Sequence, residues 1–128
     1  MRGFICGAFD LLHPGHLYTL REAKKYCDTL IVGLHVDPSY RKGKNHPCET
    51  VFERYTRLKS CKYVDQIIPY ESEEDLENML YILDLDVRFL DADYIRKPEP
   101  ITGEDIIPIH YIARYHTYSS SELRKRLK

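Results

Sequence analysis

The sequence predicts a single α/β domain over residues 1–128, a Rossmann-like three-layer sandwich with a mostly parallel five-stranded sheet. Two observations support this fold class. Short apolar runs alternate along the chain with amphipathic segments of helical period. One of these runs, residues 29–36, is apolar almost throughout, which is typical of a strand buried on both faces of a parallel sheet.

The first elements form an expected strand–helix–strand unit. Residues 2–9 are largely apolar and punctuated by glycine, which predicts a strand that ends at a tight turn. Residues 15–27 repeat apolar positions at intervals of three and four, as an amphipathic helix requires. The strand over residues 29–36 completes the unit. The polar segment 37–47 that follows is expected to be an exposed connection, long enough to move.

Capping residues locate the other helices. Thr50 and Glu53 have the capping-box spacing, which predicts a helix from there to about residue 60. Ser72 is expected to cap an acidic helix whose apolar side chains share one face. Ser119 and Glu122 form another capping box, which predicts a final helix whose basic end matches the helix dipole.

The remaining strands are expected over residues 64–69, 86–90 and 106–112. The last of them contains Pro108, which has no N–H to donate to a neighbouring strand, so we expect it at an edge of the sheet. Residues 91–105 contain two prolines and a glycine and are expected to be irregular.

The composition excludes several classes of protein. Nineteen Lys and Arg residues against twenty Asp and Glu residues give a net charge of −1, so no overall field would draw the chain to nucleic acid or to an anionic membrane. No apolar run approaches the ~18 residues of a membrane span, and no secretory segment is expected. The four cysteines include no C-x-x-C pair, which favours free thiols. We therefore expect a cytoplasmic protein without nucleic-acid or membrane partners, in which any anion site is local.

Residues 7–16 carry the clearest chemical signal, because they lead from the first strand into the first helix. Ligands of open α/β sheets bind beyond the carboxyl ends of the strands. A helix start at this place would offer an anion free backbone N–H groups and the positive end of the helix dipole. His13 and His16 would add imidazole N–H donors, and Gly15 would let a ligand approach the backbone closely. The pattern favours a polyphosphate ligand.

A zinc site and simple core packing are the other interpretations of the histidine pair. Zinc is disfavoured because the spacing is not that of H-E-x-x-H and because Asp10 is the only evident further ligand. Core packing is disfavoured because Gly15, between the two histidines, fills no space. We therefore expect no metal ion held by the protein alone.

At these residues the sequence resembles the nucleotidylyltransferase superfamily, whose hallmark is H-x-G-H. The longer string G-x-F-D-x-x-H-x-G-H is similar to that of the cytidylyltransferase branch, and every fixed position matches residues 7–16. In length and motif placement the chain is most like the bacterial glycerol-3-phosphate cytidylyltransferases. The resemblance implies that His13 and His16 are catalytic. It also implies that the nucleotide contacts Gly7, Ala8, Phe9, Asp10 and Gly15.

A second family hallmark, Arg-Thr-x-Gly-Ile/Val-Ser-Ser/Thr-Ser/Thr, is similar to residues 114–121. The resemblance implies a catalytic role for Arg114. The three hydroxyls of the hallmark are kept as Ser119, Ser120 and Ser121, whereas Tyr115, Thr117 and Tyr118 depart from it. Three consecutive serines at a helix start exceed what capping needs, so we expect them to grip the β and γ phosphates from a second side.

Further candidates are four basic residues and one aspartate. By composition the basic segment that contains Lys42 and Lys44 would be a solvated surface, but the resemblance implies that Lys44, or else Lys42, reaches over the reacting phosphates from a flexible lid. Arg54 and Lys62 fall where the family has basic residues, and either could instead be a surface charge. Asp93 falls in a stretch that lies near the base in the family, or it closes a turn.

The resemblance implies that the chain transfers a cytidylyl group from CTP to a small phosphorylated alcohol and releases pyrophosphate. The acceptor phosphate would attack the α-phosphorus directly, with Mg²⁺ on the triphosphate, so no protein nucleophile is needed. A homodimer is also implied. An ATP-dependent adenylyltransferase of the same superfamily and a nucleotide-binding regulatory module without turnover are the alternatives.

The acceptor is the least determined part of this hypothesis. Glycerol-3-phosphate comes first by length and motif, with phosphoethanolamine or phosphocholine next. The helix after Ser72 starts with acidic residues, which would repel an anion and tolerate an amine. The same residues also fit a solvated helix start matched to its dipole.

Overall fold

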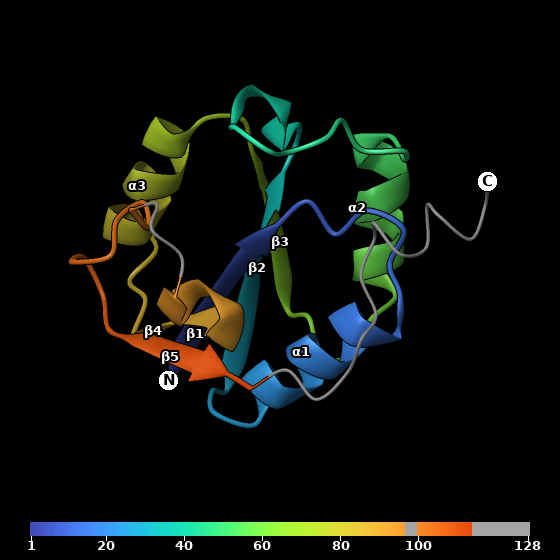
Figure 1. Ribbon diagram of the computed structural model, residues 1–128. Helices are drawn as coiled ribbons and strands as arrows, with labels where there is room; N and C mark the ends of the chain where they lie inside the picture. Colours follow the sequence, from blue (N-terminus) through green and yellow to red (C-terminus); the bar gives the residue numbers. More distant parts are fainter. Residues whose placement is uncertain (97–99, 114–128) are drawn as a thin grey trace.

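The computed structural model describes residues 1–96 and 100–113. Within them, five strands form one all-parallel sheet in the order β3-β2-β1-β4-β5 (Figure 1), which confirms the predicted fold class. The strands are β1 (Arg2–Gly7), β2 (Thr29–His35), β3 (Gln66–Tyr70), β4 (Val87–Asp91) and β5 (Ile109–Ile112). The helices are α1 (Pro14–Lys24), α2 (Val51–Lys59) and α3 (Glu73–Ile82), with short 3-10 helices η1 (Pro38–Tyr40) and η2 (Ala92–Arg96).

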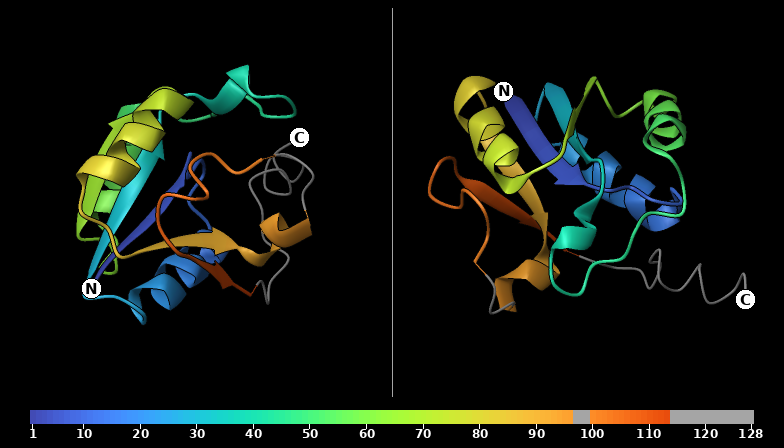
Figure 2. Two further views of the ribbon diagram at one scale, coloured as in Figure 1. Left: turned by 90° about the vertical axis from the view of Figure 1, so that its left-hand side faces the viewer. Right: turned by 90° about the horizontal axis from the view of Figure 1, so that it is seen from above.

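Helices cover both faces of the sheet, which gives the predicted three layers (Figure 2). Leu20 of α1 and Leu58 of α2 belong to the cluster on one face. Leu76 and Leu80 of α3 belong to the cluster on the other face, together with Phe4 of β1. Because successive strand residues point to opposite faces, β1 and β2 contribute side chains to both clusters.

The order of the strands reverses beside β1. β2 and β3 lie on one side of β1, and β4 and β5 lie on the other. Because all five strands are parallel, their carboxyl ends lie at one edge of the sheet, and a ligand site is expected at that edge where the order reverses. The segments that follow β1 and β4 therefore border the expected site.

Gly33 allows a close contact between β2 and β1. A Cβ atom at Gly33 would lie 2.7 Å from Cζ of Phe4, whose side chain is fully buried. Real Cβ atoms do not approach so closely, so any larger residue at Gly33 would force the Phe4 ring to shift.

The predicted helix starts at α2 and α3 are confirmed. Thr50 Oγ1 accepts the N–H of Glu53 at 3.1 Å, and Glu53 Oε1 accepts the N–H of Thr50 at 3.0 Å. Ser72 Oγ accepts the N–H of Asp75 at 3.1 Å, and Asp75 completes a capping box. The box expected at residues 119–122 lies outside the described residues.

Each of the two outer strands of the sheet, β3 and β5, has a proline within it or next to it. Pro69 lies within β3, and Pro108 directly precedes β5, so the predicted edge position of the last strand is confirmed, although the strand is shorter than predicted. The carbonyl of Pro108 still accepts the N–H of Arg88 at 2.9 Å. β3 begins later than predicted because the N–H of Val64 closes a turn onto the carbonyl of Cys61 at 3.2 Å.

The segment of residues 37–47 after β2 is more ordered than predicted. It contains η1, in which Pro38 is buried, and Asp37 Oδ1 caps this helix by accepting the N–H of Ser39 at 2.9 Å.

No helix in the described part of the chain is long and apolar enough to cross a membrane.

Candidate functional site

Residues 8–13, which connect β1 to α1, form a strained turn at the carboxyl edge of the sheet. Phe9 and Leu11 have φ angles of 50° and 51°, in the left-handed region that residues other than glycine avoid. Each such residue costs about 1–2 kcal/mol. Strain of this kind persists only where surrounding contacts over-determine the backbone. Here those contacts come from residues 48–54.

Two buried carboxylates hold the turn against the segment that precedes α2. Asp10 is 4% exposed and accepts the N–H groups of Cys48 at 2.8 Å and Glu49 at 3.0 Å. Glu49 in turn accepts the N–H of Leu11 at 2.7 Å, and its other oxygen lies 2.6 Å from Nε of Arg57. Both carboxylates therefore stabilise the backbone of the site.

Arg54 connects the same turn to the end of β2. Its side chain is 2% exposed, and Nη1 donates to the carbonyls of Ala8 at 3.1 Å and His35 at 2.7 Å. Nη2 donates to the carbonyl of Val36 at 2.6 Å, and Nε donates to that of Glu49 at 3.2 Å. The interpretation of Arg54 as a surface charge is therefore wrong. Its guanidinium is a buried brace between strand ends.

His13 and His16 form a reciprocal cap at the start of α1. Nδ1 of His13 accepts the N–H groups of Gly15 at 3.0 Å and His16 at 3.3 Å. Nδ1 of His16 accepts the N–H of His13 at 3.3 Å. The two rings stack with centroids 3.8 Å apart and planes inclined by 18°, and the ring of Phe9 lies 5.5 Å from that of His16.

This cap determines where each neutral imidazole carries its proton. A ring nitrogen that accepts a hydrogen bond has no proton, so both rings carry the proton on Nε2. Two N–H donors are thereby held next to each other at a helix start, where the helix dipole favours negative charge. The arrangement suits a phosphate group.

The expectation of free backbone N–H groups at this helix start is wrong. Pro14 has no N–H, and the N–H groups of Gly15 and His16 donate to His13 Nδ1. The N–H of Leu17 donates to the carbonyl of His13 at 3.2 Å. The donors of the first turn are therefore imidazole Nε2–H groups instead of main-chain amides, and the Nε2 atom of His13 is buried.

The contacts of Asp10 fit a backbone brace instead of a zinc ligand. Its two carboxylate oxygens accept the N–H groups of Cys48 and Glu49. Among residues 1–96 and 100–113, no group of three or more His, Cys, Asp or Glu side chains is placed to hold a metal ion.

Lys42 and Lys44 lie on a tight turn within residues 37–47. The N–H of Lys44 donates to the carbonyl of Arg41 at 3.1 Å, and Gly43 has a φ of 82°, as the third position of a type II turn requires. Both lysines are exposed. The turn therefore gathers three cations within four residues, which fits an anionic ligand.

Asp93 lies in η2, directly after β4. It is exposed, and its N–H donates to Asp91 Oδ1 at 3.1 Å. The carboxylate that closes this turn is therefore that of Asp91, and a role for Asp93 near the base stays a prediction. Tyr94 follows, and burial raises the pKa of its hydroxyl.

Lys62, another predicted residue, lies away from this site. Lys62 is exposed and precedes β3, at the end of the sheet opposite to the histidine turn, with Nζ 5.2 Å from the ring centroid of Tyr63. This position fits a surface charge and does not fit a phosphate ligand. The predicted second phosphate grip lies outside the described residues; its members are Arg114, Ser119, Ser120 and Ser121.

Sequence reasoning missed Glu49 and the bracing role of Arg54. Glu49 contacts Leu11 across 38 positions, and Arg54 contacts Ala8 across 46. No local pattern signals these contacts, because their partners are main-chain atoms far away in the sequence. The one available signal was an acidic residue directly before the Thr50 cap, where capping does not require it.

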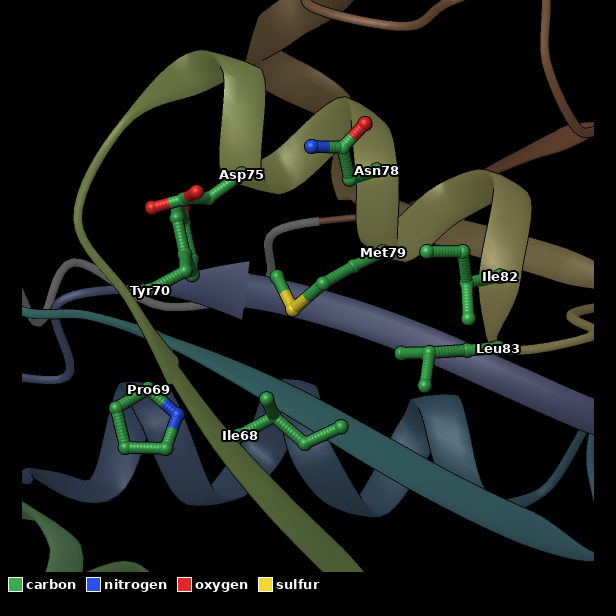
Figure 3. Close-up of a pocket in the computed structure, with 8 residues that line it drawn as sticks. All are labelled: Ile68, Pro69, Tyr70, Asp75, Asn78, Met79, Ile82 and Leu83. Carbon is green, nitrogen blue, oxygen red and sulfur yellow. The ribbon is translucent and has the colours of Figure 1, made fainter.

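A separate cavity of about 400 Å³ lies between β3 and α3 at the edge of the sheet (Figure 3). Its lining consists of Ile68, Pro69, Tyr70, Asp75, Asn78, Met79, Ile82 and Leu83. These described residues are mainly apolar and include no basic side chain, so the cavity does not suit a phosphorylated ligand.

Comparison with known protein families gives one match over most of the chain. The cytidylyltransferase-like family model matches residues 4–126. The bifunctional protein HldE of Caulobacter sp. (strain K31) is 39% identical over 107 residues, which are 82% of this chain and 21% of that protein. The HldE protein of Campylobacter jejuni serotype O:6 is 32% identical over 128 residues, 98% of this chain and 27% of that protein. The chain therefore spans about a fifth to a quarter of the length of these relatives.

Solved structures share the fold. A lipopolysaccharide core biosynthesis protein from Thermoplasma volcanium superposes with a TM-score of 0.70 and 26% identity, covering 93% of this chain and 98% of that one. A pantothenate synthetase from Thermus thermophilus superposes with a TM-score of 0.63 over 98% of this chain and 64% of that one. Its 13% identity supports likeness of fold alone.

Proposed function

The chain belongs to the cytidylyltransferase-like family, and from that premise we propose that it transfers a cytidylyl group from CTP to a small phosphorylated alcohol and releases pyrophosphate. The family and the relatives support a nucleotidyltransferase, whereas CTP and the acceptor belong to the proposal. Glycerol-3-phosphate is the first acceptor to test, followed by phosphoethanolamine and phosphocholine. Phosphorylated sugars join them, because one similar structure is that of a lipopolysaccharide core biosynthesis protein.

The reciprocal cap of His13 and His16 is the observation that carries this proposal. It turns two stacked imidazoles into neutral Nε2–H donors whose tautomers are set by the main chain. Donors fixed in advance stabilise the charge that develops on departing pyrophosphate without having to reorganise during the reaction.

The reaction needs alignment and charge neutralisation instead of a protein nucleophile. An ionised oxygen of the acceptor phosphate attacks the α-phosphorus, and the bond from this phosphorus to the bridging oxygen of pyrophosphate breaks. In the proposal, His13 and His16 hold the triphosphate and Lys44 neutralises the reacting phosphates. Arg114 and the serines of residues 119–121 hold the β and γ phosphates from a second side.

Mg²⁺ is proposed to arrive on the nucleotide. This ion prefers oxygen ligands and commonly binds through substrate phosphates and water. Within the described residues no acidic cluster is placed to hold it, and Asp10 and Glu49, which brace the histidine turn, accept main-chain N–H groups. The triphosphate oxygens therefore fit the ion better than the carboxylates of the turn. When bound, it would neutralise charge on those oxygens.

The end of β4 is the reason to keep ATP as a second candidate donor. The family that the chain resembles often has Gly-Asp/Ser-Asp-Trp/Tyr near the base, where this chain has residues 91–94. Asp91 therefore replaces the glycine, and its carboxylate accepts the N–H of Asp93 at 3.1 Å. A carboxylate in place of glycine changes the surface offered to a base. An adenylyl transfer by the same direct attack is therefore the second function to test.

Product identification tests the proposal. The protein is incubated with Mg²⁺, one of the four ribonucleoside triphosphates and each acceptor, and pyrophosphate release and product mass are measured. A CDP-linked product is expected. His16→Ala should lower turnover by about 10²–10³ while the fold is retained. His110→Ala serves as the control, because His110 lies on β5 and packs against Tyr26.

Three outcomes contradict the proposal in different ways. An AMP-containing product replaces the CTP assignment with the ATP assignment. A loss of less than tenfold in His16→Ala removes the assigned role of that donor. Nucleotide binding, seen as a raised melting temperature, without pyrophosphate release from any pair supports a regulatory module.

A further inference from the structure

Glu73, the first residue of α3, joins two loops to the start of this helix at the carboxyl edge of the sheet. Its Oε2 accepts the hydroxyl of Tyr40 at 2.7 Å, from the segment after β2. Its Oε1 accepts the hydroxyl of Thr102 at 2.8 Å, from the segment before β5. Nη1 of Arg41 lies 3.7 Å from the same Oε1. One carboxylate therefore holds the loops that follow β2 and β4.

Tyr40 is also held from the core. Nε2 of His35 lies 2.8 Å from the Tyr40 hydroxyl oxygen, and because this hydroxyl donates to Glu73, its oxygen accepts from the His35 ring. His35 is 3% exposed and stacks on Tyr70 with ring centroids 4.5 Å apart. A chain of hydrogen bonds therefore runs from a buried ring through Tyr40 to Glu73.

Helix capping does not account for Glu73. Ser72 and Asp75 already form the capping box of α3. Glu74, the next residue in the same turn, is exposed, as expected of an acidic residue that only matches the helix dipole. The side chain of Glu73 is 29% exposed and makes the contacts described above.

The carboxylate of Glu73 is kept ionised by these contacts. Burial by itself would raise the pKa of Glu73, but the hydrogen bonds from Tyr40 and Thr102 and the charge of Arg41 outweigh it and hold this pKa below its ordinary value. At neutral pH the Glu73 carboxylate, the anchor of these loops, therefore carries a negative charge next to the basic turn of residues 41–44.

The loop that contains the basic turn is also closed at its base. Nδ1 of His46 lies 2.8 Å from Asp37 Oδ2. Tyr40 precedes the turn and His46 follows it, so the segment with Lys42 and Lys44 lies between two anchored points. Of these two points, Tyr40 is the one that connects the loop to α3 through Glu73.

We propose that Glu73 is a positioning residue that, through Tyr40 and Arg41, holds the basic turn of residues 41–44 at the carboxyl edge of the sheet. This inference rests on the proposed function, which assigns Lys44 to the reacting phosphates. Cations held in place lose less freedom when an anion binds, and they stay aligned with the reacting groups. Loss of the Glu73 anchor therefore lowers kcat/KM, because Lys44 is no longer held in position.

Limited digestion with trypsin tests the anchor without any enzyme assay, because the turn contains three trypsin sites. The bond after Lys44 is followed, since Lys44 does not itself contact Glu73. In Glu73→Gln and Tyr40→Phe we expect this bond to be cut about tenfold faster than in the unmodified chain. Glu74→Gln, in the same helical turn, is the matched control and should be cut at the unmodified rate. Equal rates in all four proteins overturn the proposal.

A double-mutant cycle tests whether Glu73 acts through Lys44. Glu73→Gln should lower kcat/KM by about tenfold in the unmodified chain and by less than about twofold in the Lys44→Ala background. Equal losses in the two backgrounds overturn the proposal, because Glu73 would then act independently of Lys44. If no pair of substrates reacts, the proposed function fails, and the trypsin result still decides whether Glu73 anchors the turn.

Discussion

Replacing His13 separates its two roles, the helix cap made by Nδ1 and the N–H donor at Nε2. His13→Ala removes both. His13→Asn keeps a side-chain oxygen that caps a helix well but removes the imidazole donor. Stability and catalysis are therefore expected to respond differently to the two substitutions.

The expected magnitudes follow from the contacts of the ring. Nδ1 accepts two main-chain N–H groups, and loss of such a cap costs about 1 kcal/mol. Loss of the stacked contact with His16 adds about 1 kcal/mol. For a domain of this size, 1 kcal/mol corresponds to about 4 °C in melting temperature. His13→Ala should therefore melt about 8 °C lower than the unmodified chain, and His13→Asn about 4 °C lower.

Thermal unfolding followed by circular dichroism and pyrophosphate release together check this reasoning. Both substitutions should lower kcat/KM by about 10²–10³, because both remove the donor. If His13→Asn retains more than a tenth of the activity, the Nε2–H group is not the catalytic donor. If the two variants melt at the same temperature, the cap contributes nothing to stability and the geometric reasoning is refuted.

Three further predictions concern stability. Burial lowers the pKa of His35 in the folded chain. As the pH falls below about 6.5, the unfolded chain therefore takes up a proton before the folded chain does. The free energy of unfolding then decreases by up to about 1.4 kcal/mol per pH unit, until the pH reaches the pKa of His35 in the folded chain. Urea unfolding should show a shallower decrease in His35→Gln, and an unchanged slope would contradict this. Arg54→Met should lose at least about 3 kcal/mol in urea unfolding, because three buried or partly buried carbonyls lose their donor; a loss below about 1 kcal/mol would show that water replaces it. Gly33→Ala should lose about 1–3 kcal/mol in thermal unfolding because its Cβ would meet Phe4, whereas an unchanged melting temperature would mean that the ring moves freely.

Most of the fold is predictable because local patterns specify it. The apolar run at residues 29–36 indicates a parallel strand, the Thr50 cap marks the start of α2, and Pro108 excludes a central strand. The late start of β3 is not predictable in the same way. It depends on a turn closed between the N–H of Val64 and the carbonyl of Cys61, and this contact competes with an apolar pattern that already reads as a strand.

The candidate site is only partly predictable. The histidine pair is visible because its members are three positions apart and share a helix start. Their Nδ1 atoms cap the helix, which leaves Nε2 as the donor. This arrangement depends on backbone geometry and cannot be predicted from the residue types. The anchor at Glu73 was hidden for another reason. Its partners, Tyr40 and Thr102, lie in segments that the sequence marks only as irregular.

The carboxylates around the histidine turn explain how a chain of net charge −1 can present an anion site. Asp10 and Glu49 are buried behind the turn, where Asp10 accepts two main-chain N–H groups and Glu49 accepts one and also pairs with Arg57. Their charge is therefore compensated within the protein, while the imidazole donors occupy the helix start. Because these contacts join residues 10–11 to residues 48–49, the turn takes this form only when the segment before α2 packs against it. A bound phosphate would in turn favour that packed state, which couples ligand binding to the docking of α2.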